Sequence, residues 1–188
     1  MVDPHDDPIA LVDSRHEEWR QLFEAERDRL ERLFDRRGLA TCVHRIDHVG
    51  STAVPDLAAK DIVDVDVVVA DDAVADVSKA IQADLRGTRY ENTATWQPVF
   101  RRVDGQRIND HVFGHTDPGW RISVATAAVL KERGDLRSRY ERLKRREAAE
   151  TDDLETYSRA KTTFVADLLA VADGLALGFE IPPIDESG

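Results

Sequence analysis

The stretch DHVGSTAVPDLAAKDIVDVDVVV, residues 47–69, decides the fold and raises the question of function. Its second half, DIVDVDVVV at 61–69, alternates valines with Asp64 and Asp66, a pattern that predicts a strand. Two carboxylates at positions i and i+2 of a strand point the same way and repel each other. Either water screens that repulsion, as on an ordinary acidic surface, or a cation binds between the two side chains.

Patterns on either side of this stretch predict the other elements. Apolar residues at three- and four-residue spacing predict a helix over 14–37, and Gly38 ends it. The dipeptide Asp104-Gly105 predicts a hairpin with strands near 98–103 and 107–113. The remaining elements are expected to be a strand at 40–49, a short helix at 51–60 interrupted or begun at Pro55, the strand at 61–69, and helices at 71–87, 120–133, 135–150 and 152–172.

These elements predict an α/β (α+β) fold with a small mixed sheet, flanking helices and a helical C-terminal portion. The four strands are expected to share one sheet, with Val63, Val65 and Val67 buried against helices. Asp64 and Asp66 would then lie on the opposite, open face of that sheet. Because neither a linker nor a repeat divides the sequence, we expect a single domain over 1–175 and a loosely attached tail at 176–188.

The charge balance restricts the class of partner. Acidic residues number 37 against 26 basic ones, which gives the 188-residue chain a net charge of −11. General nucleic-acid binding is disfavoured, because its affinity comes mostly from cationic residues that meet phosphates. Only five of the basic residues are lysines, and an acidic, lysine-poor surface predicts a halophilic protein. The basic segment RSRYERLKRRE at 137–147 is interpreted as a solvated helix face, since Glu141 and Glu147 interleave it.

Other features of the composition predict a cytoplasmic location. Cys42 is the only cysteine, so the chain has no internal disulfide. The segment MVDPHDDPIA at 1–10 lacks the basic-then-apolar pattern of a signal peptide. No apolar run approaches the roughly 18 residues that a membrane span requires, so we expect no membrane partner.

The Gly-Ser pair before the acidic strand predicts a phosphate site. Gly50 and Ser51 lie between a strand and the expected short helix, where backbone N–H groups and a hydroxyl can hold a phosphate. The spacer to Asp64 is long enough for the chain to return to the sheet, with both carboxylates facing the same opening. Since Mg²⁺ takes carboxylate and phosphate oxygens, this arrangement suits a Mg²⁺-bound nucleoside triphosphate.

A family resemblance rests on this stretch and on later segments in the same order. HVGS followed by DVDV fits the nucleotidyltransferase superfamily pattern, and the string HVGSTAVPDLAAKDIVDVDVVV resembles the GrpB-like family within it. The likeness continues through VFRR at 99–102, DHV at 110–112, DPGWR at 117–121 and YSRAKTTFVADLL at 157–169. It covers about residues 10–172 and implies a nucleotidyltransferase-like sheet.

The resemblance also implies roles for single residues. Asp64 and Asp66 match the metal-binding and catalytic pair of the superfamily, and Gly50 and Ser51 match its phosphate-binding turn. Lys60 matches a family lysine that could reach a phosphate. The family has a His-x-His-Val pattern where this chain reads Asn109-Asp110-His111-Val112, so one histidine is replaced. The third metal ligand is therefore either His111 or Asp110, and Asp110 has the opposite strand parity.

Three functions follow from this reading. The first is a Mg²⁺-dependent nucleotidyltransferase that transfers a nucleotidyl group from a nucleoside triphosphate to the hydroxyl of a small molecule or protein. In it, Asp64 and Asp66 would hold the metal, Gly50 and Ser51 the triphosphate, and Lys60 or Lys161 the leaving pyrophosphate. The second is a non-catalytic nucleotide- or metabolite-binding module with the same fold, which the altered later strand favours. The third is a metal-assisted phosphohydrolase, for which water is the acceptor.

The charge excess generates a prediction about salt. Added salt should relieve repulsion among the excess acids, which adds over the whole surface. We expect the melting temperature to rise continuously between low and molar KCl. A melting temperature that stays flat or falls over that range would contradict the halophilic interpretation.

Overall fold

The computed structural model describes residues 10–150, 154–170 and 176–182. Within these ranges a five-stranded sheet has the order β1-β2-β5-β4-β3. The strands are β1 (Val43–Val49), β2 (Ile62–Val69), β3 (Thr88–Arg89), β4 (Val99–Val103) and β5 (Gln106–Gly114). Only the β2–β5 pair is parallel, and the other neighbours are antiparallel. The predicted fold class is confirmed.

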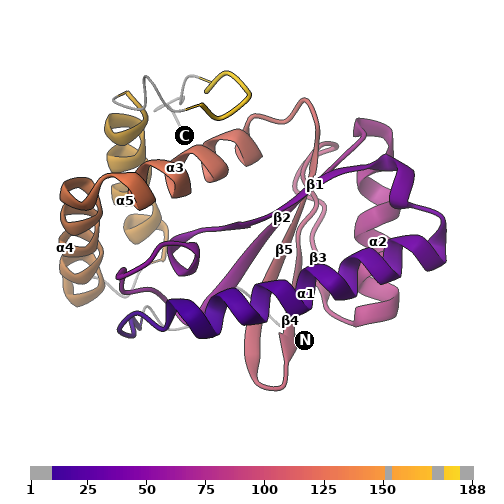
Figure 1. Ribbon diagram of the computed structural model, residues 1–188, viewed down its shortest axis with the longest axis horizontal. Coiled ribbons are helices and arrows are strands. Elements are labelled where there is room, and N and C mark those ends of the chain that lie inside the picture. The colour runs from indigo at the N-terminus through magenta and orange to yellow at the C-terminus, as the bar shows by residue number, and fades with distance from the viewer. Residues whose placement is uncertain (1–9, 151–153, 171–175, 183–188) are drawn as a thin grey trace.

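Helices cover both faces of this sheet (Figure 1). The helices α1 (His16–Arg37) and α2 (Val74–Leu85) pack on one face, and α3 (Gly119–Glu132) lies over the other. The helices α4 (Gly134–Glu150) and α5 (Leu154–Leu169) join α3 in the helical C-terminal portion, at the left of Figure 1. No helix in the described part of the chain is long and apolar enough to cross a membrane.

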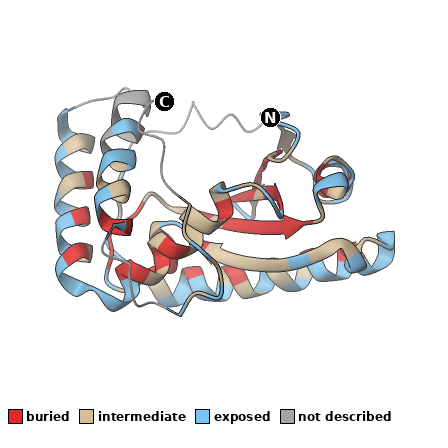
Figure 2. Ribbon diagram, turned by 90° about the horizontal axis from the view of Figure 1, so that it is seen from above, coloured by how far each residue is buried: buried red, intermediate tan, exposed pale blue. Residues whose placement is uncertain are grey.

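The main core lies between the sheet and α1 with α2. The valines at 63, 65, 67 and 69 are fully buried there, as the period-2 pattern predicts. They meet Trp19, Phe23 and Leu30 of α1, which ends at Gly38 in a left-handed conformation with φ 68°. Figure 2 shows the central strands mainly in red, whereas the helices expose their outer faces.

The C-terminal helices enclose a second apolar cluster. It contains Val54, Leu130, Tyr140 and Leu168, so it joins the segment after β1 to all three C-terminal helices. The described part of the predicted tail, 176–182, packs against it through Leu177, Phe179 and Ile181, and the Phe179 ring also lies edge-on to Trp120 with centroids 5.0 Å apart. The predicted helix boundaries at 152 and 172, and the tail beyond 182, lie outside the described residues.

Two expectations about the sheet surroundings are wrong. The predicted helix at 51–60 is a single 3₁₀ turn over Ser51–Ala53, because Val54 precedes Pro55 and is extended, with φ −107° and ψ 124°. The face that carries Asp64 and Asp66 is covered rather than open: α3 and α5 border it, and Asp66 is 1% exposed. The C-terminal helices pack on the sheet face that the sequence pattern marked as polar.

A buried ion cluster holds α1 to the sheet. Arg101 of β4 donates through Nε to Asp110 of β5 at 2.6 Å and through Nη2 to Glu26 of α1. All three side chains are at most 2% exposed. Burial and the nearby Asp110 carboxylate raise the pKa of Glu26 to about 7. Arg101 therefore bridges two buried acids, and Glu26 has a second cation in Arg29, whose Nη1 donates to it at 3.0 Å.

This cluster generates a stability prediction. Replacing Arg101 with Met would remove the cation that Asp110 contacts and leave Glu26 with Arg29 alone, so we expect a loss of about 3–5 kcal/mol in the free energy of unfolding. Urea unfolding monitored by circular dichroism would measure it. The matched control is Arg102→Met, because the neighbouring Arg102 is exposed. A loss below about 1 kcal/mol for Arg101→Met, the scale of a surface ion pair, would contradict the prediction.

Candidate functional site

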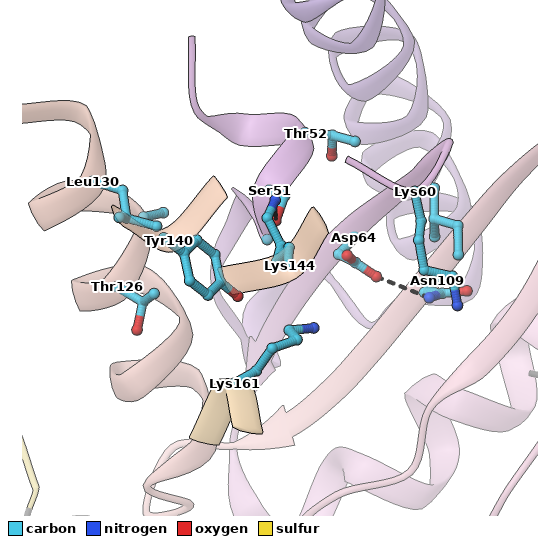
Figure 3. A pocket seen from close by; sticks show the side chains of 13 residues that line it. Ser51, Thr52, Lys60, Asp64, Asn109, Thr126, Leu130, Tyr140, Lys144 and Lys161 are labelled. Carbon is cyan, nitrogen blue, oxygen red and sulfur yellow. Dashed lines mark hydrogen bonds between the residues drawn. The ribbon is translucent and has the colours of Figure 1, made fainter. Parts of the chain in front are cut away.

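The parallel pairing of β2 and β5 determines which polar side chains lie next to one another in the site. Asp64 lies opposite Asn109, and Asp66 opposite His111. The Asn109 amide donates from Nδ2 to Asp64 Oδ1 at 2.8 Å (Figure 3). The His111 Nε2 atom lies 3.6 Å from the same oxygen, an ionic contact rather than a hydrogen bond. Alternation along both strands therefore brings four polar side chains to one face.

The two carboxylates have different surroundings. Asp64 keeps 28% of its side chain exposed. Burial opposes its ionisation, but the His111 ring and the Asn109 amide outweigh that effect and leave its pKa lowered. Burial raises the pKa of Asp66 to about 8. The Ser123 hydroxyl faces Asp66 but donates to the Gly119 carbonyl at 3.1 Å, so both Asp66 oxygens lack a hydrogen-bond partner.

Gly50 is required by its conformation and by its neighbour. Its φ is 71°, a region that glycine adopts at little cost. A Cβ atom at this position would lie 2.5 Å from Asp64 Oδ2, so the turn passes directly over the carboxylate. The backbone amides of Ala53 and Val54 bond within the turn. Because the expected helix is absent, a phosphate here would depend on side chains more than on a helix N-terminus.

A buried lysine supports this turn. Lys144 of α4 is 1% exposed, and its Nζ donates to Ser51 Oγ at 2.9 Å and to the Ala58 carbonyl. Nζ also lies 4.9 Å from the centre of the Tyr140 ring. Burial lowers the pKa of Lys144 to about 7. Its two hydrogen-bond acceptors are neutral, so the amine lacks a contacting carboxylate to stabilise its charge.

A first cavity of about 220 Å³ opens beside this lysine. It brings together five of the predicted site residues: Gly50, Ser51, Lys60, Asp64 and Lys161. Lys161 extends from α5 into the space between Tyr140 and Asp64 (Figure 3). With Lys144, three of the five lysines of the chain line this one cavity, which makes it suited to a polyanion.

A second cavity of about 590 Å³ adjoins the first. Asp66 and His111 line only this one, whereas Gly50, Asp64, Thr126 and Lys161 line both. Its other walls are largely apolar and come from Trp96, Phe113 and the helices α3 and α5. The predicted site residues therefore lie around two neighbouring cavities that meet at Asp64.

The structure decides the orientation of the possible third metal ligand. Asp110 points to the opposite face, where it pairs with Arg101, so His111 is the candidate on the side of the carboxylate pair. Across the described ranges, no group of three or more His, Cys, Asp or Glu side chains is arranged to hold a metal ion. His111 is turned toward Asp64, and its ring does not complete a three-ligand set with the two aspartates.

Sequence reasoning missed three residues of the site. Lys144 lies in the segment 137–147 that was interpreted as a solvated face, and this is wrong for Lys144 and Tyr140, both buried. The charges that surround them on α4 mask the signal, although the scarcity of lysine offers a hint. The third, Asn109, was recognised only as a replaced histidine, and its bond to Asp64 depends on the strand register.

Comparison with known proteins connects this geometry to a family. The sequence profile described as GrpB protein matches residues 8–170. The chain belongs to the GrpB family. It is 30% identical to a UPF0157 protein of Deinococcus radiodurans over 83% of this chain and 84% of the relative. It is also 30% identical to a UPF0157 protein of Halalkalibacterium halodurans, over 90% and 85%.

More distant relatives agree on the fold. The UPF0157 protein YqkA of Bacillus subtilis is 25% identical over 80% of this chain, which spans only 43% of that longer relative. The crystal structure of the conserved protein GrpB from Enterococcus faecalis superimposes with a TM-score of 0.70. The match covers 87% of this chain and 96% of that one at 23% identity, so it supports the fold alone.

The buried lysine generates a pH prediction. Between pH 7 and 10 the unfolded chain holds a proton on residue 144 that the folded protein has released, so stability should rise with pH through this window. We expect wild type to gain roughly 2 kcal/mol between pH 7.5 and 9.5 relative to Lys144→Met, measured by urea unfolding. Lys79→Met, at an exposed lysine of α2, is the control. Parallel pH profiles for wild type and Lys144→Met would refute this account.

Proposed function

We propose that this protein is a nucleotidyltransferase that binds a nucleoside triphosphate with Mg²⁺ and transfers its nucleotidyl group to an acceptor hydroxyl. The single observation that carries the proposal is the junction of the two cavities. A lysine-lined cavity meets a carboxylate pair at Asp64, beneath the Gly50 turn. A polyanion in the first cavity would thus end beside Asp64, the only carboxylate of the described residues that lines both cavities.

The first cavity supports binding of the triphosphate. Ser51 presents a hydroxyl at the turn, and Lys144 holds that hydroxyl from behind. Lys60 and Lys161 line the same cavity and supply the positive charge that a leaving pyrophosphate requires. Arrival of a phosphate would also give Lys144 an anionic neighbour, which favours its protonated form. The cavity would therefore gain positive charge at Lys144 as the ligand binds.

The carboxylate pair fits a hard divalent cation. Mg²⁺ is usually held by one or two carboxylates together with substrate phosphates and waters, so a three-residue protein cage is unnecessary. Asp64 and Asp66 share one strand face, and both Asp66 oxygens are buried without a partner, as expected of a group that awaits a cation. Bound there, Mg²⁺ would neutralise charge on the transferring phosphoryl group.

Neighbouring residues of the chain hold the Asp64 carboxylate in a fixed orientation. The Asn109 amide and the His111 ring hold Asp64 from the β5 side, and the close approach of Gly50 leaves it little freedom on the other. Asp64 is the partly exposed carboxylate and has a lowered pKa, so it remains ionised and can accept a hydrogen bond from the attacking hydroxyl. Asp66 is enclosed and would act only by binding the cation.

One observation favours a second candidate, a nucleotide-binding module without catalysis. Position 109 carries an amide that already bonds to Asp64, and among the described residues the pair has no further acid, His or Cys arranged with it to hold a metal ion. A site with two acids can hold a Mg²⁺-bound nucleotide without promoting transfer. Release of pyrophosphate from a nucleoside triphosphate in the presence of candidate acceptors would separate this module from the enzyme.

Replacing Asp66 with Asn tests the metal assignment. Without ligand, the variant should be at least as stable as wild type, because it removes a buried carboxyl group whose ionisation is opposed by burial and by the charge of Asp64. The gain should grow as pH rises toward 8, since over that range wild type must retain a proton that the unfolded chain releases. The same change deletes an anionic ligand, so calorimetry should show Mg²⁺-dependent binding of a non-hydrolysable ATP or GTP analogue weakened at least tenfold.

A matched control exists in the hairpin turn. Asp104→Asn removes the same charge outside both cavities, at a position with φ 50° that Asn tolerates. It should change neither the stability nor the binding. Equal nucleotide affinity of Asp66→Asn and wild type would reject the metal site. A loss of apo stability without a change in affinity would indicate a purely structural role for Asp66.

A further inference from the structure

The second cavity is bordered by polar atoms that lack hydrogen-bond partners. Buried polar atoms in native proteins nearly always have partners. In the described part of the chain, seven residues carry buried side-chain atoms without one, and four of them line this cavity: Asp66, Trp96, His111 and Thr126. Two of the other three, Arg101 and Asp110, belong to the ion cluster on the opposite face.

A cation would account for only one of these four residues. Metal binding would satisfy the oxygens of Asp66, but it would leave Trp96 Nε1, His111 Nδ1 and Thr126 Oγ1 without partners. The indole N–H can only donate, whereas the imidazole nitrogen and the hydroxyl can donate or accept. A group that bonds to all three must therefore carry at least one hydrogen-bond acceptor, together with further polar atoms.

The apolar part of the second cavity, called the slot below, has one wall on the sheet side and one on the helix side. On the sheet side, the rings of Trp96 and Phe113 are nearly parallel, at 9° with centroids 5.9 Å apart, and His111 lies within about 6 Å of both. On the helix side the wall is aliphatic, with Pro118 and Ile122 of the α3 region and Val165 of α5. Aromatic faces opposite an aliphatic wall favour a flat ring between them.

The loop before β4 holds this slot in place. The backbone of Trp96 pairs with Phe113 across an isolated bridge, and Gln97 N–H donates to the Val112 carbonyl at 3.0 Å. The Thr95 hydroxyl donates to Asp117 Oδ2 at 2.7 Å, which ties the loop to the segment before α3. The aromatic wall is thus fixed without a ligand, as is usual for small-molecule sites.

We propose that the second cavity binds a small molecule with a planar aromatic or heteroaromatic ring that bears hydrogen-bonding substituents, seated between Trp96 and α3. The identity of this molecule rests on the proposed function, because the ring would belong to one of its two substrates. The ring belongs either to the acceptor, whose hydroxyl would then face Asp64, or to the base of the nucleoside triphosphate. Both sources share the same chemistry.

Two ring compounds serve as probes: 5-hydroxyindole, a planar ring with a hydroxyl, and adenosine, a nucleoside without phosphates. Binding would be measured by saturation-transfer NMR on the full chain, with inorganic tripolyphosphate measured separately by calorimetry. Trp96→Leu removes the aromatic wall, and Thr126→Val removes a polar atom while keeping the volume. Tyr90→Leu is the matched control, because this half-buried tyrosine comes from the same part of the chain and lies outside both cavities.

We expect at least one probe to bind to wild type, about tenfold more weakly to Trp96→Leu, and with wild-type affinity to Tyr90→Leu. Thr126→Val should weaken the probe without changing the melting temperature by more than a few degrees. Tripolyphosphate should bind equally to wild type, Trp96→Leu and Tyr90→Leu. If an ATP analogue displaces the probe but tripolyphosphate does not, the ring belongs to the nucleotide base. If the probe stays bound beside the analogue, the ring belongs to the acceptor.

Two results would overturn the inference. The first is failure of both probes to bind at millimolar concentration, which would mean that water alone satisfies the cavity. The second is equal binding to wild type and Trp96→Leu. Neither result depends on tripolyphosphate. If wild type binds a ring probe but does not bind tripolyphosphate, the result would instead contradict the proposed function and would not affect the proposed ring site.

Discussion

The parallel pairing of β2 with β5 is the constraint on which the rest of the site depends. It places Asn109 beside Asp64 and His111 beside Asp66, and it sends Asp110 to the other face. A shift of one residue in this register would exchange the two faces of β5. Asp110 would then lie beside the carboxylate pair, and Arg101 would lose one of its two acidic partners. One register therefore fixes both the ion cluster under α1 and the polar face under α3.

Local patterns were sufficient to predict much of the fold. The alternation in β2, the Asp-Gly turn of the hairpin and the apolar stripe of α1 each depend on neighbouring residues, and each was predicted within a few positions. The face covered by α3 could not be predicted in the same way. It depends on how three helices distant in sequence pack on the sheet, and two aspartates on a strand give the same pattern whether water or a helix covers them. Lys144 was missed for a related reason, because its 93-residue separation from Ser51 leaves no periodic signal.

Burial brings two ionisable groups of the site closer to their neutral forms than their formal charges suggest. The pKa of Asp66 is raised to about 8 and that of Lys144 is lowered to about 7, so near neutral pH both groups favour their uncharged forms more than exposed counterparts would. The fold is thus spared part of the cost of burying unpaired charges. A cation beside Asp66 and a phosphate beside Ser51 would reverse both shifts. The two ligands would therefore cooperate by charge, even though the groups they recharge lie in different cavities.

Asp64 is the point at which these effects meet. It lines both cavities, is partly exposed, and keeps a lowered pKa because His111 and Asn109 hold it on one side. The Gly50 turn closes over its other side so tightly that any Cβ atom would collide with the carboxylate. The turn and the strand are therefore mutually adapted, because only a residue without a side chain fits at position 50 above Asp64. A triphosphate bound in the first cavity, as proposed, would therefore end beside Asp64, which also lines the second cavity.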